Sequence, residues 1–383
     1  DIGSITKVFT ALALSEMARR GDVALNDPVA RYLSPTLTLP RDGDRQITLA
    51  DLATHTSSLP LRPDNLVSKD PDNKYAGYTV ARLHRFASSF RPVRAIGSQY
   101  EYSNVGYALL GTALARRAGL GYRELIRARI TGPLGMRDTR MELSPGMRRR
   151  LASGHTSELA PARHWDMGAL ESAGGLRSTA GDLLRFLEAI LGYRKSGLAP
   201  AMAAMLETRR KGGMLPSTYI ALAWNIYQDG GREIAWKNGS VGGYRAFIGY
   251  DPARRIGVVA LANAQTAGGA DDIGLHLLDP QTPVDLHIPR AHKAIKVSAA
   301  ILERYVGRYK YSDTDILTVT REGDHLFGQE PGQDRIELFA EGERDFFIQV
   351  VDAQVTFELS PHGTASAAIW HQAGQDQRGT RMP

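Results

Sequence analysis

The chain has 383 residues, of which 43% are hydrophobic and 23% charged, as in folded globular proteins and unlike disordered ones. It contains no cysteine, which excludes disulfides, thiolate metal sites and cysteine nucleophiles. Its formal net charge is +6, which permits weak attraction to anionic surfaces, but the basic residues are scattered and predict no nucleic-acid interface.

The first predicted helix begins at the start of the chain and ends near Gly21. Its apolar residues recur at the spacing of one helix face, namely Ile5, Val8, Phe9, Leu12, Ala13 and Met17. Glycine readily takes the left-handed conformation that ends a helix, so Gly21 is the expected stop. Ser4 is expected either as the N-cap or as a first-turn residue.

Further helices and then strands are predicted along the chain. One helix starts at Thr48, with Asp51 completing a capping box, and others span Val105–Ala118, Tyr122–Ile130 and Thr179–Leu191. From Tyr219 the pattern becomes that of strands between glycine-containing turns. The predicted strands are Tyr219–Trp224, Ile234–Trp236, Ala246–Tyr250 and Ile256–Ala262, and a short helix follows at Ile273–Leu278.

A change in composition divides the chain into two predicted domains. Residues 281–298 contain Pro283 and Pro289, directly after Pro280, and read as a linker between a domain at 1–280 and one at 299–383. The second domain is expected to be a small antiparallel barrel or sandwich. Its predicted strands are Leu317–Thr320, His325–Gly328, Arg335–Phe339, Phe346–Val350, Gln354–Leu359 and Ala367–His371.

The sequence Ser4-Ile5-Thr6-Lys7 is the first candidate for chemistry. A serine and a lysine three residues apart share one face of a helix, and a lysine with a lowered pKa is a plausible base for a serine nucleophile. Taken alone the pattern is weak. A helix-capping serine followed by a surface lysine is the simpler alternative.

Two more short motifs follow. Tyr102-Ser103-Asn104 offers a phenol for proton transfer and an amide for a substrate carbonyl, with a packed loop tyrosine and Asn104 as a helix N-cap as the alternative. Lys237-Asn238-Gly239-Ser240 ends an apolar strand. There a lysine can hold an anion and a glycine lets a substrate approach closely, with a plain hairpin turn as the alternative.

Together, in this order, the three motifs resemble those of the penicillin-recognising serine hydrolases, which include class C β-lactamases, penicillin-binding proteins and β-lactamase-like esterases. The resemblance covers residues 1 to about 278 and includes the framing segments 52–60 and 174–179. It implies an α/β fold, in which an antiparallel sheet is flanked by helices and accompanied by an all-helical subdomain. The tail from about Ala299 resembles the small β-rich domain often appended to such hydrolases.

The resemblance also implies roles for individual residues. Ser4 would be the nucleophile and Lys7 its proton partner, and Tyr102 would act as general base and acid with a pKa lowered by charged lysines. Asn104 would contact the substrate amide, and Lys237 would face a substrate carboxylate. The backbone N–H groups of Ser4 and Ser240 would form the oxyanion hole. No metal or organic cofactor is implied.

Three features depart from the family pattern. Asn238 stands beside Gly239 where threonine is usual, so a hydroxyl that often touches the carboxylate is missing. Arg62 stands near where class C enzymes commonly place a glutamine that binds the substrate, which suggests a differently charged or narrower pocket. The family also places strands before the nucleophile, and these are expected upstream of Asp1.

The resulting functional hypothesis is a serine acyl hydrolase for small-molecule substrates. β-Lactams or D-alanyl peptides are favoured because of Lys237, and simple esters are the alternative. A penicillin-binding sensor that is acylated without turnover is an alternative of another class. The family resemblance predicts an exported bacterial protein, and the net charge allows loose association with the cell envelope. No run of about 18 apolar residues predicts a transmembrane helix.

Overall fold

The computed structural model describes residues 1–70, 72–157, 159–214, 218–229, 231–266, 269–284, 292–312, 315–330, 335–348, 353–372 and 375–383. The chain divides into two compact units. The first comprises Asp1–His155, Pro161–Gln265 and Gly269–Pro283, and the second comprises Thr156–Ala160, Thr266–Gly268 and Val284–Pro383. Each unit has its own hydrophobic core.

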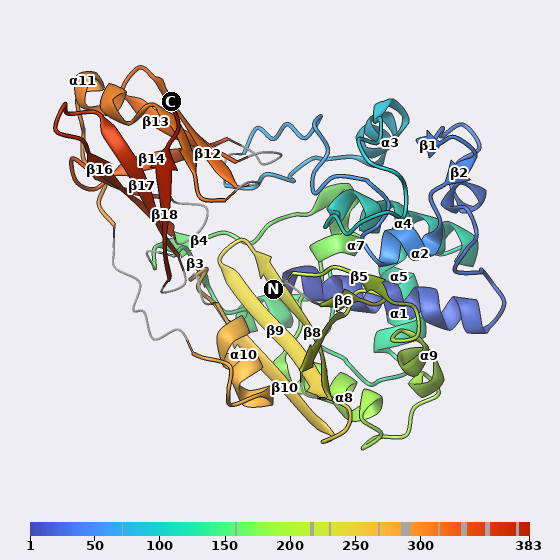
Figure 1. The fold of residues 1–383 in the computed structure, drawn as a ribbon. Coiled ribbons are helices and arrows are strands. Elements are labelled where there is room, and N and C mark those ends of the chain that lie inside the picture. Colours follow the sequence, from blue (N-terminus) through green and yellow to red (C-terminus); the bar gives the residue numbers. More distant parts are fainter. Residues whose placement is uncertain are drawn as a thin grey trace. The chain divides into compact units, whose positions relative to one another are not determined.

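A six-stranded antiparallel sheet forms the first unit's framework (Figure 1), in the order β10-β9-β8-β7-β6-β5. Its strands are β5 (Arg210–Lys211), β6 (Tyr219–Ile220), β7 (Asn225–Asp229), β8 (Arg232–Val241), β9 (Tyr244–Asp251) and β10 (Ile256–Ala262). The predicted strand Ile256–Ala262 is confirmed, and the two predicted before it lie within the longer β8 and β9. The prediction of a strand over Tyr219–Trp224 is wrong beyond Ile220, because the chain turns there with Ala223 at a φ of 69°.

The two faces of this sheet pack against different elements. On β8, Ala235 and Val241 belong to the main core, whereas Ile234 and Trp236 pack in a separate cluster with Leu278 of α10 (Asp271–Leu278). Successive side chains of a strand point to opposite faces. The strand therefore directs its odd-numbered residues, including Lys237, into the main core and its even-numbered residues toward α10.

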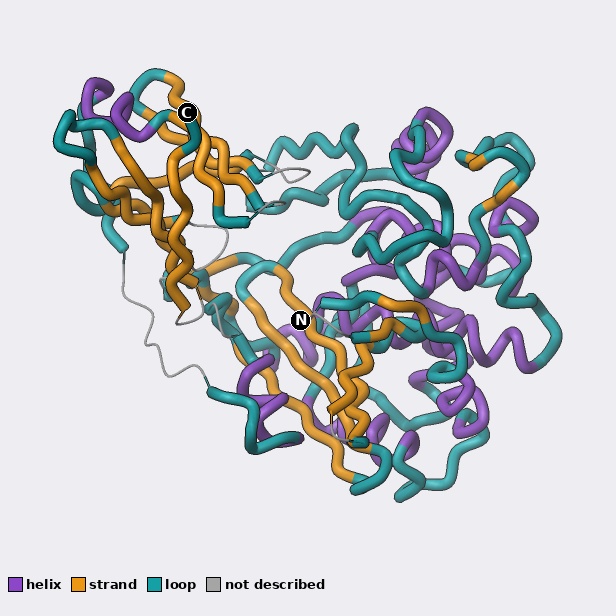
Figure 2. The backbone as a smooth tube through the Cα atoms, in the orientation of Figure 1, coloured by secondary structure: helices purple, strands orange, loops and turns teal. Residues whose placement is uncertain are grey.

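Helices cover the sheet and form a separate helical part of the first unit (Figure 2), as the sequence predicts. The longest are α1 (Thr6–Arg19) and α4 (Asn104–Ala118), which contact each other, and α8 (Ala180–Ile190) packs on β10. The remaining helical elements are η1 (Gly3–Ile5), η2 (Val29–Tyr32), α2 (Leu49–Ala53), α3 (Val80–Ser89), α5 (Tyr122–Ile126), the π-helical η3 (Arg127–Thr131), α6 (Pro145–Arg150), η4 (Gly168–Leu170), α7 (Glu171–Gly174) and α9 (Ala199–Ala204). Two short ladders, β1 (Arg41–Asp42) with β2 (Arg45–Gln46) and β3 (Gly154–His155) with β4 (Pro161–Ala162), complete it.

The capping residues seen at the helix N-termini can be compared with the predicted ones. Thr48 forms the expected capping box with Asp51, and the Thr179 side chain accepts a hydrogen bond from the Asp182 N–H at the start of α8. Ser4 lies in the 3-10 turn that leads into α1 and does not cap it. The alternative that made Asn104 an N-cap is wrong, because the Ser103 side chain caps α4 and Asn104 is its first residue.

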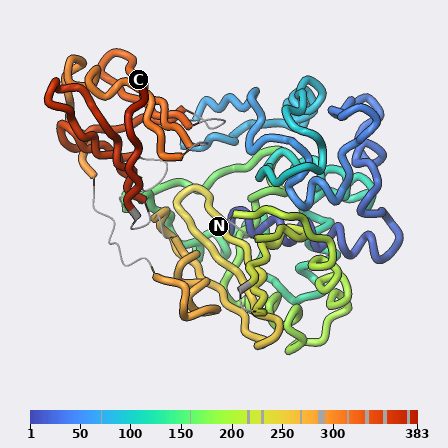
Figure 3. The backbone as a smooth tube through the Cα atoms, in the orientation of Figure 1, coloured from blue at the N-terminus to red at the C-terminus, as the bar shows by residue number. Residues whose placement is uncertain are grey.

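The second unit contains a closed barrel of eight antiparallel strands, which decides between the predicted barrel and sandwich. The strands are β11 (Gly307–Lys310), β12 (Ile316–Glu322), β13 (His325–Gln329), β14 (Ile336–Ala340), β15 (Asp345–Phe347), β16 (Ala353–Leu359), β17 (Ala365–Gln372) and β18 (Gln375–Arg381), preceded by α11 (Ala299–Leu302) and η5 (Glu303–Tyr305). The tube in Figure 3 follows them in chain order. All six predicted strands are present, although Gln349 and Val350, at the end of the fourth, lie outside the described residues.

The strands that the sequence did not predict, β11 and β18, are the two that pair to close the barrel. β11 reads Gly-Arg-Tyr-Lys, which is too short for its single buried tyrosine to indicate a strand, and β18 reads Gln-Asp-Gln-Arg-Gly-Thr-Arg, which has no alternation of apolar and polar residues. Inside the barrel, the rings of Tyr305 and Tyr309 pack against Phe357. In the described part of the chain, every helix is too short or too polar to cross a lipid bilayer.

Candidate active site

The turn η1 and the start of α1 place Ser4 beside Lys7. Lys7 is fully buried, and its Nζ lies 3.0 Å from Ser4 Oγ. The same nitrogen donates to Asn104 Oδ1 at 2.7 Å and to the Ala173 carbonyl at 2.7 Å. The structure thus brings the first motif and the asparagine of the second together, and the alternative of a surface lysine is wrong.

Burial and a second lysine determine the protonation of Lys7. Removal from water disfavours an ammonium ion, and this effect, with the positive charge of Lys237 added, holds the pKa of Lys7 well below its usual value. The neutral amine form of Lys7 is therefore favoured relative to that of an exposed lysine. A neutral lysine amine next to a serine hydroxyl is able to accept the hydroxyl proton.

Tyr102 lies between the two lysines. Lys7 Nζ is 4.8 Å from the centre of its ring and Lys237 Nζ is 4.9 Å from it. Burial raises the pKa of Tyr102, and an interaction of its hydroxyl with Ser4, which falls short of hydrogen-bond geometry, opposes that rise. The prediction that charged lysines lower this pKa is wrong for this structure, because loss of solvation has the largest effect and raises it.

His55 accepts hydrogen bonds from the residues on both sides of Tyr102. Its backbone carbonyl accepts from the Glu101 N–H at 2.7 Å, and its Nδ1 accepts from the Ser103 N–H at 3.0 Å. The ring centroids of His55 and Tyr102 are 4.3 Å apart. Burial and the charges of the two lysines keep the pKa of His55 well below its usual value, so the imidazole is neutral.

We expect His55→Asn to be tolerated and His55→Ala to be destabilising. His55 has a φ of 57°, which asparagine adopts more readily than alanine, and an asparagine side chain can also accept from the Ser103 N–H. Alanine would leave that buried N–H unpaired at a cost of about 1–3 kcal/mol, with backbone strain of about 1–2 kcal/mol added. Urea unfolding of both variants measures the difference, and equal stabilities would contradict this role of His55.

The backbone of β8 lies directly against η1, the turn that carries Ser4, although the two are far apart in the sequence (Figure 3). A Cβ atom on Gly239 would sit 2.0 Å from the Ile2 carbonyl oxygen and 3.1 Å from Ser4 N. Gly3, at a φ of 47°, likewise leaves no room, because its Cβ would sit 2.8 Å from Ser240 N. Two glycines therefore allow the main chains of Ser4 and Ser240 to approach each other.

The other predicted site residues lie around this centre. Lys237 is buried, and its Nζ lies 3.4 Å from Asn238 Oδ1. The Ser240 side chain is exposed and its Oγ accepts from Gln265 Nε2 at 3.2 Å. The Leu61 carbonyl accepts a hydrogen bond from the Asn104 N–H at 3.2 Å. The backbone of the next residue, Arg62, therefore lies next to the site.

Sequence reasoning missed two groups at this site. One is the Ala173 carbonyl, for which the only signal is the family-like segment that begins at the next residue, Gly174. The other is Asp271, the first residue of α10, whose Oδ2 accepts a short hydrogen bond from Asn238 Nδ2. An aspartate after glycines at a helix start is too common to predict such a contact.

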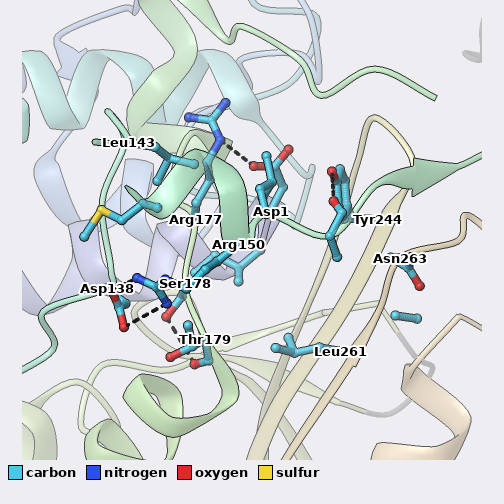
Figure 4. A pocket seen from close by; sticks show the side chains of 15 residues that line it. Asp1, Asp138, Leu143, Arg150, Arg177, Ser178, Thr179, Tyr244, Leu261 and Asn263 are labelled. Carbon is cyan, nitrogen blue, oxygen red and sulfur yellow. Dashed lines mark hydrogen bonds and ion pairs between the residues drawn. The ribbon is translucent and has the colours of Figure 1, made fainter. Parts of the chain in front are cut away.

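A separate hollow of about 330 Å3 lies elsewhere in the first unit, lined by residues that include Asp1, Arg150, Arg177 and Tyr244 (Figure 4). Ser4 does not line it. Its arginines are paired, Arg177 with Asp1 at 2.7 Å and Arg150 with Asp138 at 2.6 Å. The Ser178 hydroxyl in its lining is hydrogen-bonded to the Thr139 hydroxyl at 2.8 Å and not to a basic side chain, so the cluster around Ser4 remains the candidate active site.

Two protein-family models match parts of the chain. The family model described as Beta-lactamase matches residues 1–282, and a domain of unknown function (DUF3471) matches residues 291–381. The D-alanyl-D-alanine-carboxypeptidase/endopeptidase AmpH of Escherichia coli K12 is 32% identical over 269 residues, 67% of this chain and 68% of that protein. Penicillin-binding protein 4* of Bacillus subtilis 168 is 26% identical and covers 98% of this chain and 86% of its own.

A solved structure of a beta-lactamase/D-alanine carboxypeptidase from Yersinia pestis superposes with a TM-score of 0.61 at 26% identity. The match covers 69% of this chain and 77% of that one.

Proposed function

The chain belongs to the beta-lactamase family and is a serine hydrolase, and from this premise we propose that it works through an acyl-enzyme on Ser4. The observation that carries the proposal is the buried Lys7 amine, 3.0 Å from Ser4 Oγ. A neutral amine has two N–H groups and one lone pair. If its N–H groups point to Asn104 Oδ1 and the Ala173 carbonyl, the lone pair is left for the Ser4 proton.

In the first step Lys7 takes the proton of Ser4 while Ser4 Oγ bonds to the substrate carbonyl carbon. The resulting oxyanion accepts hydrogen bonds from the backbone N–H groups of Ser4 and Ser240, each worth about 3–4 kcal/mol in comparable hydrolases. The approach of the two main chains at Gly3 and Gly239 supports this arrangement.

In the second step the leaving group departs with a proton. Because burial raises its pKa, Tyr102 is a neutral phenol that can donate this proton and recover one from Lys7. Water then attacks the acyl carbonyl and gives a proton to Lys7 and Tyr102. These residues pass the proton to Ser4 Oγ as its bond to the acyl carbon breaks, which releases the acid and restores the Ser4 hydroxyl. Asn104 keeps Lys7 in place and offers its amide to the substrate.

The substrate proposed is a β-lactam or a D-alanyl peptide. Lys237 is a buried cation beside Tyr102, and a fixed cation there suits a substrate that bears a carboxylate. Relatives named as a carboxypeptidase and as a penicillin-binding protein support this class. A short-chain ester is the second candidate, favoured by Asn238 and Arg62, which depart from the β-lactamase pattern.

The test is hydrolysis of a chromogenic cephalosporin and of a p-nitrophenyl short-chain ester by the same preparation. We expect cephalosporin turnover to exceed ester turnover. Turnover of the ester alone would transfer the assignment to carboxylesterase. A stable penicillin adduct on Ser4 in mass spectrometry, without turnover, would instead make the protein a penicillin-binding sensor, and neither adduct nor turnover would refute the proposed function.

We also propose that the protein is exported and acts at the bacterial cell envelope, because cell-wall peptides are found there. The net charge of +6 is compatible with weak adsorption to anionic envelope polymers.

A further inference from the structure

The amide of Asn238 connects the two faces of β8. Lys237 points into the main core, where Tyr102 and Lys7 lie, and Asn238 points to the opposite face, toward α10. Asn238 Oδ1 accepts from Lys237 Nζ at 3.4 Å, and its Nδ2 donates to Asp271 Oδ2. A continuous polar chain thus runs from Lys237 through Asn238 to Asp271.

An asparagine is suited to this bridge. Its amide carries the donor and the acceptor on two different atoms, so it can contact a lysine on one side and a carboxylate on the other. Threonine, the residue that the family resemblance predicts here, offers a single hydroxyl oxygen on a shorter side chain.

Asp271 is the anion that opposes the positive charges around Lys237. On one side Lys237 faces Lys7 and the neutral ring of Tyr102. On the α10 side of β8, the carboxylate of Asp271 faces the Arg245 guanidinium of β9. The negative charge of the next residue, Asp272, also acts on Asp271. Burial lowers the pKa of Lys237 to about 8, and the charge of Asp271 prevents a larger fall.

We propose that Asp271 is a positioning residue that acts through Asn238 to hold the Lys237 ammonium where it can receive an anionic group of the substrate. The inference rests on the proposed function and adds a residue that none of the three motifs contains. It predicts that Asp271 affects substrates with a carboxylate far more than neutral esters.

The first test is the variant Asp271→Asn, which keeps an acceptor for Asn238 and removes the charge. Loss of a nearby anion disfavours the ammonium form, so the alkaline limb of kcat/KM should move to lower pH by about one unit. The kcat/KM for a carboxylate-bearing substrate at pH 7.5 should fall about tenfold, and that for a neutral ester should change less than about twofold. Asp272→Asn is the matched control, since it removes the same charge from the same helix end and leaves the Asp271 acceptor of Asn238 in place.

The second variant, Asn238→Thr, keeps both charges and removes the amide bridge. It should reproduce the loss of selectivity for carboxylate-bearing substrates over neutral esters. The double variant should lose no more of this selectivity than Asp271→Asn alone, because both changes break the same polar chain. Additive losses in the double variant would overturn the inference. This variant also serves if Asp271→Asn unfolds.

A readout without turnover separates this inference from the proposed function. The pKa of Lys237 can be followed by NMR of 13Cε-labelled lysine in the full chain, with Lys237→Arg identifying the signal. A lower pKa in Asp271→Asn than in the Asp272→Asn control supports the bridge even if Ser4-dependent hydrolysis is absent. An unchanged pKa and unchanged selectivity in an active enzyme would overturn the bridge and leave the proposed function intact.

Discussion

Replacing Ser4 by alanine is expected to reduce hydrolysis of the best substrate by a factor of about 10^4 or more. The change removes the Oγ atom that is proposed to form the covalent intermediate and leaves Lys7 with its contacts to Asn104 and Ala173. The side chain removed is small and half-buried, so the thermal unfolding temperature should change little. Initial rates with the chromogenic substrate measure the loss of hydrolysis. Mass spectrometry after exposure to penicillin shows whether the covalent adduct is lost as well.

A second serine provides the matched control. Ser240 is proposed to act through its backbone N–H, and its side chain is exposed, so Ser240→Ala keeps the group that matters. We expect its rate to stay within about threefold of wild type. A covalent adduct that persists in Ser4→Ala would place the nucleophile elsewhere and contradict the mechanism.

Replacing Lys7 by methionine is expected to lower kcat by about 10^3-fold or more without unfolding the protein. Methionine has a similar length and no charge, so it removes the proton acceptor and also removes the need to bury an amine. The acceptors on Asn104 and Ala173 lose their donor, at a cost of about 1–3 kcal/mol each. These opposing effects leave a small net change in stability, which thermal unfolding measures beside the steady-state rate.

Lys195→Met is the control for this variant, because Lys195 is an exposed lysine in the loop after α8. Its rate and stability should both match wild type. If Lys7→Met retained more than about a tenth of the activity, Lys7 would not be the proton acceptor, and Tyr102 would take that role.

Local sequence signals predicted the parts of this molecule that depend on neighbours in the chain. The proximity of Ser4 to Lys7 follows from their separation by three residues on a helical turn, and the Thr48 and Thr179 caps follow from residues three positions apart. The apolar run Ile256–Ala262 is sufficient to define β10. The resemblance of the three motifs then brought Tyr102 and Lys237 to the same centre.

The parts that were missed depend on contacts between distant segments or on burial. No local pattern shows that the His55 imidazole accepts from the Ser103 N–H, or that Asn238 donates to Asp271. The pKa of Tyr102 was expected to fall because of its lysine neighbours, whereas the extent of its burial, which only the folded chain reveals, makes it rise. A closing strand such as β18 pairs through its backbone on both sides and needs no apolar alternation.

The contact between η1 and β8 has a consequence for how such a site can diversify. Because Gly239 meets the main chain of Ile2 and Gly3 meets that of Ser240, a larger side chain at either glycine would push η1 and β8 apart. Changes in specificity are therefore expected at the side chains around this contact, such as Arg62 and Asn238, and not at the two glycines.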